Sequence, residues 1–64
     1  MEYTDIRELV RIRHTLRTLA AGGDRGLAAS LLDRMRALGS RDAEENAAVQ
    51  PEVQRWQFVF RLET

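Results

Sequence analysis

Two short glycine-containing breaks divide this chain of 64 residues into three segments, and they restrict its fold more than any other feature. The breaks lie at Gly22-Gly23 and at Gly39-Ser40. Glycine just after a helical pattern is a common helix end, because it adopts the left-handed conformation without steric cost. Connections this short place consecutive helices side by side and antiparallel. The sequence therefore predicts a mainly α fold, an antiparallel helical hairpin followed by a third segment, in one small helical domain over residues 1–64.

The first segment, residues 4–21, has the apolar periodicity of an amphipathic helix. Its apolar stripe consists of Leu9, Ile12, Leu16 and Leu19, flanked by Ile6, Val10 and Ala20. Spacings of three and four residues are typical of one helix face. Thr4 or Asp5 is the predicted N-cap. Arg13 and Arg17 lie beside this stripe, where they would interrupt the apolar face of a monomer. We expect them either to meet acidic groups at an interface or to lay their aliphatic stems along the stripe with the guanidinium at its edge.

The second segment, residues 25–38, supplies the matching apolar stripe. Asp24 precedes it as a predicted N-cap. The stripe consists of Leu27, Ala28, Leu31, Leu32, Met35 and Leu38. We expect this face to pack against the stripe of the first segment and so to form the hairpin.

The third segment fits two structures. Ser40 is its predicted N-cap, and Pro51 should either break a helix or begin a new one. A helical stripe is formed by Val49, Val53, Trp56 and Phe60. The two-residue alternation of residues 56–63, which puts Trp56, Phe58, Phe60 and Leu62 on one side, instead fits a strand within residues 52–63. We favour the helix because no second strand-like segment exists to satisfy a strand's backbone groups. A strand would have to pair with another chain, for example the same strand of a dimer.

The composition excludes several classes of site. Ten basic residues, all arginine, balance ten acidic residues, and the chain has one histidine and no cysteine. This excludes a disulfide and a thiolate metal site, and one histidine cannot build a usual zinc site, so we expect no metal and no cofactor. No apolar run approaches the roughly 18 residues of a membrane span, and the N-terminus has no signal-peptide pattern. We therefore expect a cytoplasmic protein without membrane contact.

Residue types suited to catalysis are few. His14 is the only histidine, and the glycine-rich stretch 22–26 lacks the spacing and the lysine of a phosphate-binding loop. Glu44 and Glu45 are adjacent, so on a helix they point about 100° apart and form a poor carboxylate pair. The sequence predicts no catalytic residue and no enzyme.

The C-terminal segment carries the strongest functional signal. Five large apolar side chains occupy seven positions, namely Trp56, Phe58, Val59, Phe60 and Leu62. One element of so small a domain cannot easily bury all of them, and exposed apolar patches commonly mark interfaces. Together with Arg13 and Arg17 they form the predicted interface. We expect a non-enzymatic protein-binding module, a regulator or inhibitor, that forms a homodimer and binds a protein partner with an acidic surface.

Two alternatives remain open at this point. Arg7, Arg11 and His14 share the opposite face of the first helix and would serve a small DNA-binding transcriptional regulator, or an acidic partner. The zero net charge argues against nucleic acid, because phosphate neutralisation supplies much of the affinity of DNA-binding domains. The second alternative is a structural subunit of a larger assembly.

Overall fold

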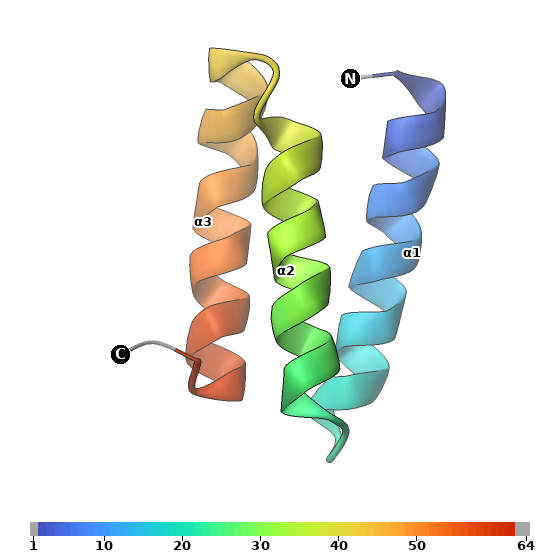
Figure 1. The fold of residues 1–64 in the computed structure, drawn as a ribbon, viewed down its shortest axis with the longest axis vertical. Helices are drawn as coiled ribbons and strands as arrows, with labels where there is room; N and C mark the ends of the chain where they lie inside the picture. Colours follow the sequence, from blue (N-terminus) through green and yellow to red (C-terminus); the bar gives the residue numbers. More distant parts are fainter. Residues whose placement is uncertain (1, 63–64) are drawn as a thin grey trace.

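A computed structural model describes residues 2–62 and contains three α-helices in this range. They are α1 (Tyr3–Ala20), α2 (Arg25–Gly39) and α3 (Ala43–Phe60). Each runs antiparallel to the next in a shallow bundle whose Cα atoms extend over 31 × 24 × 14 Å (Figure 1). Residues 2–62 contain no strand, so the helical prediction for the third segment is confirmed and the strand alternative is wrong; Glu63, at the end of that segment, lies outside the described residues.

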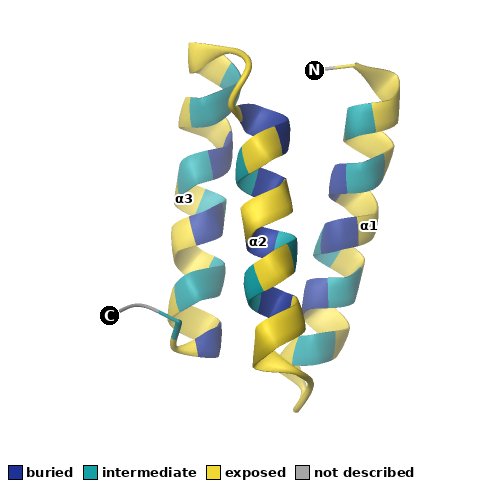
Figure 2. Cartoon of the chain, in the orientation of Figure 1, coloured by how far each residue is buried: buried dark blue, intermediate teal, exposed yellow. Residues whose placement is uncertain are grey.

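The core forms where the apolar stripes of the three helices meet. Its largest fully buried side chains are Leu16, Leu32, Met35 and Val53. Full burial of a side chain of this size contributes roughly 1.5–3 kcal/mol. The remaining buried apolar residues are Leu9, Ile12, Ala28, Leu38, Val49 and Phe60, and they lie on the sides on which the helices face one another (Figure 2). The predicted stripes are thus confirmed at their centres. Leu27, predicted as part of the second stripe, is exposed, and so are the flanking residues Ile6, Val10 and Ala20.

The start of α2 follows the prediction. The side chain of Asp24 accepts hydrogen bonds from the backbone N–H groups of Gly26 at 2.8 Å and Leu27 at 3.3 Å. This cap satisfies two of the donors that the first turn of a helix leaves without partners.

The predicted caps of the other two helices are wrong. Asp42, not Ser40, caps α3 by accepting a hydrogen bond from the N–H of Glu44 at 2.7 Å. Ser40 instead follows α2, and its hydroxyl donates to the carbonyl of Ala37 at 2.9 Å. α1 begins at Tyr3 with no side-chain cap, so the predicted capping residues 4 and 5 lie inside its first turn. Asp42 directly precedes the first residue of α3, whereas Ser40 lies three residues before it, so only Asp42 is placed to cap the first turn.

Pro51 neither breaks α3 nor begins a new helix, because α3 continues through it as a single helix of 18 residues. The exposed proline lies between Val49 and Val53, both of which are buried in the core. Burial of these two valines holds the helix on both sides of the position where proline lacks its N–H donor. Tertiary packing therefore overrides the local helix-breaking signal.

α2 and α3 lie very close together near the second break. A Cβ atom added at Gly39 would lie 2.8 Å from Cγ2 of Val49, so no larger side chain fits there without movement. α1 and α3, in contrast, each pack against α2 more than against each other. The bundle therefore has one loosely packed seam, between α1 and α3.

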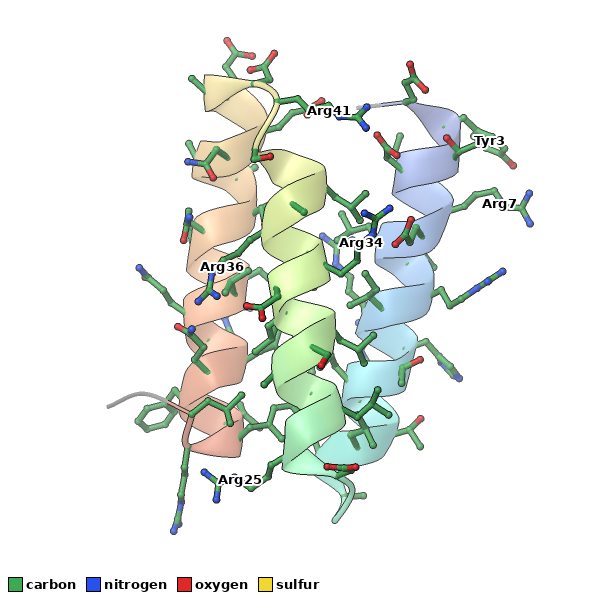
Figure 3. All side chains as sticks on the ribbon, in the orientation of Figure 1. Tyr3, Arg7, Arg25, Arg34, Arg36 and Arg41 are labelled. Carbon is green, nitrogen blue, oxygen red and sulfur yellow. The ribbon has the colours of Figure 1, made fainter. Side chains whose placement is uncertain are left out.

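The C-terminus of α3 ends in a Schellman motif. Arg61 adopts the left-handed conformation with φ 55°, and the N–H of Leu62 donates to the carbonyl of Gln57 at 2.8 Å. This turn brings Leu62 back against the core. Arg25, the first residue of α2, extends toward this end of α3 (Figure 3) and donates to the carbonyls of Phe60 and Arg61.

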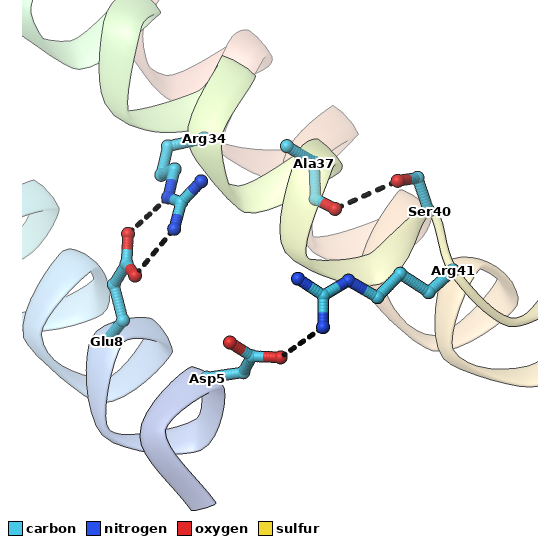
Figure 4. A network of polar contacts seen from close by, with 6 residues as sticks. All are labelled: Asp5, Glu8, Arg34, Ala37, Ser40 and Arg41. Atoms are coloured by element: carbon cyan, nitrogen blue, oxygen red, sulfur yellow. Dashed lines mark hydrogen bonds and ion pairs between the residues drawn. The ribbon is translucent and has the colours of Figure 1, made fainter. Parts of the chain in front are cut away.

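Ion pairs hold α1 to the remainder of the chain (Figure 4). Arg34 of α2 forms a bidentate pair with Glu8 of α1, which lowers the pKa of that carboxyl through their hydrogen bond. Arg41, in the second break, contacts Asp5 at 3.5 Å. Exposed pairs contribute only about 0–1 kcal/mol each. These two ion pairs also neutralise the negative charges of Glu8 and Asp5 on α1 with arginines of the same chain.

No helix in the described range combines the length and the apolar character that a membrane crossing requires.

Candidate interaction groove between α1 and α3

A bidentate ion pair joins α1 to α3 at the seam. Nε and Nη2 of Arg13 donate to the two carboxylate oxygens of Glu52, each at 2.7 Å. The indole N–H of Trp56 donates to the same carboxylate at 3.4 Å. Both charged side chains are partly buried, and the hydrogen bond from Arg13 holds the pKa of Glu52 below its ordinary value despite the opposing effect of burial. The acidic group that we expected beside Arg13 is thus provided by α3 of the same chain.

A groove of about 350 Å³ runs along this seam. α1 contributes Arg13 and Arg17 to its lining, and α3 contributes Glu52, Arg55, Trp56 and Val59. α1 and α3 run in the same direction, so Arg17 follows Arg13 by one helical turn just as Trp56 follows Glu52. The ion pair therefore crosses the groove, and the next turn of each helix forms its walls.

The groove combines apolar surface with unpaired positive charge. The ring of Trp56 stacks on that of Phe60, with centroids 6.0 Å apart, and Val59 is 48% exposed. Arg17 and Arg55 form no ion pair with any residue in the range 2–62. A planar guanidinium suits bidentate contact with a carboxylate, and arginine and tryptophan are typical of the centres of interfaces. This arrangement suits a ligand that presents carboxylates beside an apolar group.

The predicted C-terminal cluster divides into a core part and a surface part. Phe60 is buried, and Trp56 and Leu62 pack partly buried against the core. Phe58 is 75% exposed and Val59 is 48% exposed. A single chain therefore buries more of this cluster than the sequence suggested. For Leu62 the cause is the turn at the end of α3, which returns it to the core.

The second predicted set lies on another face of α1. Arg7, Arg11 and His14 are all exposed, and the guanidinium of Arg7 lies 5.8 Å from the ring centre of Tyr3. Figure 3 shows Tyr3 and Arg7 pointing away from the other two helices. The structure does not bring this set to the groove.

Sequence reasoning missed two residues of the groove, Glu52 and Arg55. The available signal was helical spacing, since Glu52 lies four residues before Trp56 and therefore on the same face of α3. That spacing does not reveal which helix this face meets.

Within the described range no group of three or more potential ligand side chains could hold a metal ion. Comparisons with protein-family models, curated proteins and solved structures found no match.

Proposed function

We propose that this chain is a small non-enzymatic protein-binding module, a regulator or inhibitor, that recognises an acidic protein partner through the groove between α1 and α3. The observation that carries the proposal is the position of Arg17 and Arg55, two guanidinium groups without a described ion-pair partner, beside the partly buried Trp56 and the exposed Val59.

Charge pairing elsewhere in the molecule supports this assignment. Two acidic residues, Glu8 of α1 and Glu52 of α3, already form ion pairs, with Arg34 and Arg13 respectively. The positive charge at the groove is therefore not cancelled by these carboxylates. A partner carboxylate would gain contacts with Arg17 and Arg55 without displacing an existing pair.

Selection of peptides from a phage-displayed random library against the immobilised protein tests the proposal. Enriched peptides should contain Asp or Glu next to apolar residues. Their affinity should fall about tenfold or more for Arg17→Ala/Arg55→Ala, since truncating an arginine hot spot costs about 2 kcal/mol or more and about 1.4 kcal/mol corresponds to tenfold. The matched control is Arg7→Ala/Arg11→Ala, which removes the same number of positive charges from another face and should leave the affinity unchanged.

Two results would overturn the proposal. One is the absence of any enriched acidic peptide, and the other is enrichment of peptides that bind the groove variant and wild type equally. Binding of random duplex DNA at low salt, lost in Arg7→Ala/Arg11→Ala, would support the DNA-binding alternative instead.

Homodimerisation has its own supporting observation, the 75% exposure of Phe58. A large exposed aromatic side chain is typical of a contact surface. Light scattering over a concentration series should give a dimer mass that falls for Phe58→Ser, with Gln54→Ser as the control on the same helix. A monomer at all concentrations would contradict this part of the proposal.

A further inference from the structure

We infer that the partner element is an amphipathic α-helix, lying along α1 from the groove to the exposed side chains of Ile6 and Val10. This inference rests on the proposed function and adds the shape of the ligand. Its starting observation is an apolar strip on α1 that has no partner within the described residues: Ile6 is 46% exposed and Val10 is 56% exposed.

This strip is continuous with the groove. At about 100° per residue, Ile6, Val10, Arg13 and Arg17 fall within about 60° of one another on the surface of α1. Arg13 contacts Glu52, which shows that this side of α1 borders α3. A single surface of α1, which we call the α1 strip, therefore contains Ile6, Val10, Arg13 and Arg17.

On the α3 side of the seam, the residue one turn before Glu52 is small. Ala48 precedes Glu52 by four residues and therefore lies one turn earlier on the same side of α3. Ala48 is exposed, and its side chain is a single methyl group. At the level of Val10 the α3 side of the seam is therefore a single methyl group, which leaves room for another helix to approach both α1 and α3.

The length and spacing of the strip fit a helix better than an extended peptide. Ile6 to Arg17 spans about 16 Å at 1.5 Å per residue, or about three helical turns. A partner helix lies against such a face with apolar residues at spacings of three and four, whereas an extended peptide usually adds to a sheet edge. The described residues contain no sheet.

The charges also determine where the partner helix should carry carboxylates and where it should carry apolar side chains. Arg17 lies at one end of the α1 strip, where Arg55 of α3 lines the same groove, and Ile6 and Val10 lie at the other end. The complementary helix has carboxylates opposite the arginines and apolar side chains opposite Ile6 and Val10. Charge complementarity of this kind fixes register and partner choice.

The experiment uses the tightest peptide from the library selection and the full chain. Trp56 is the only tryptophan, so its fluorescence reports occupation of the groove when the peptide itself lacks tryptophan. Ile6→Ser/Val10→Ser should weaken binding about tenfold, as expected for loss of apolar contacts worth about 1.4 kcal/mol. Leu27→Ser, at a residue of similar exposure (45%) on α2, is the matched control and should bind like wild type.

A second measurement tests the helical form directly. Replacing the central residue of the peptide with proline should weaken binding about tenfold or more, and circular dichroism should show a gain of helix when the unmodified peptide binds. Circular dichroism of each protein variant alone establishes that it retains the wild-type fold. If one protein variant fails to fold, the proline-substituted peptide still tests the helical form, because it is measured with the wild-type protein.

The outcomes separate this inference from the proposed function. One outcome is peptide binding that requires Arg17 and Arg55 but is unaffected by proline in the peptide and by Ile6→Ser/Val10→Ser in the protein. This would overturn the helical ligand and leave the acidic-partner proposal intact. A failure to select any acidic peptide would overturn both. Concentration-dependent dimerisation that Ile6→Ser/Val10→Ser abolishes would overturn the inference by assigning the α1 strip to a second copy of the chain.

Discussion

Arg25, at the start of α2, donates a hydrogen bond from Nε to the carbonyl oxygen of Phe60, at the end of α3, over 3.0 Å. Its Nη2 donates to the carbonyl of Arg61 at 2.6 Å. The last carbonyls of a helix have no partner within it, and the negative end of the helix dipole favours a cation. One side chain thus completes the end of a helix that is not its own.

Arg25→Ala should lower the free energy of unfolding by about 1 kcal/mol, because it leaves both carbonyls without this charged donor. Urea denaturation with an unchanged m-value would measure the effect. Arg11→Ala, at an exposed arginine on α1, is the control and should change stability by less than about 0.5 kcal/mol. Equal effects of the two substitutions would contradict this account of Arg25.

Gly39→Ala should destabilise the protein by about 1–2 kcal/mol, although alanine is the better helix former, because the added methyl overpacks the contact with Val49. Val49→Ala removes the opposing Cγ atoms. A double-mutant cycle should therefore give a favourable coupling of about 0.5 kcal/mol or more. Additive effects in thermal or urea unfolding would show that the close approach of α2 and α3 is not the cause.

The stabilising effect of Glu52 should depend on pH. Because Arg13 lowers the pKa of Glu52 in the folded protein, the stabilisation is present above the ordinary carboxyl pKa of about 4.3 and is lost as the pH falls through the lower folded value. Glu52→Gln should cost about 1 kcal/mol at pH 7, as for a well-formed partly exposed pair, and almost nothing well below pH 4.

The control for this pH dependence is Arg13→Gln, which removes the main cause of the lowered pKa. In the Arg13→Gln background, Glu52→Gln should lower the free energy of unfolding by much less at pH 7, and this cost should change little toward acid pH. Urea unfolding at each pH measures it. A pH-independent cost of Glu52→Gln in the wild-type background would count against the ion pair as the source of stability.

Pro51→Ala should raise the free energy of unfolding by about 1–3 kcal/mol, because it restores the missing N–H donor in the middle of α3 and removes the steric conflict of the ring. The exposed Gln54, one turn later, provides the control: Gln54→Ala should change stability by less than about 0.5 kcal/mol. A less stable Pro51→Ala variant would indicate that the proline makes contacts that stabilise the fold.

The sequence predicts those parts of the fold that depend on neighbouring residues. Asp24 identifies the start of α2 because an N-cap acts over three residues, and the buried positions Leu9, Ile12 and Leu16 follow from helical spacing. Pro51 was misleading for the opposite reason. Its local preference is overcome by the burial of valines on either side, which only the packed bundle provides.

The candidate site was predicted less completely, because it is made by two helices distant in the sequence. The need of Arg13 for an acidic neighbour was evident, but its partner Glu52 lies 39 positions away. Similarly, the sequence does not distinguish Phe58 from Phe60, yet the side of α3 that faces the core buries Phe60 and leaves Phe58 exposed. No local pattern determines which face of α3 meets α1.

The loose seam between α1 and α3 also has a kinetic consequence. Contacts within each pair of neighbouring helices close short loops and form fast, whereas a contact across 39 positions needs both hairpins in place. We therefore expect the groove to arise in the final step of folding. A ligand that binds it would slow unfolding and leave the folding rate unchanged, since the binding surface is absent from the transition state.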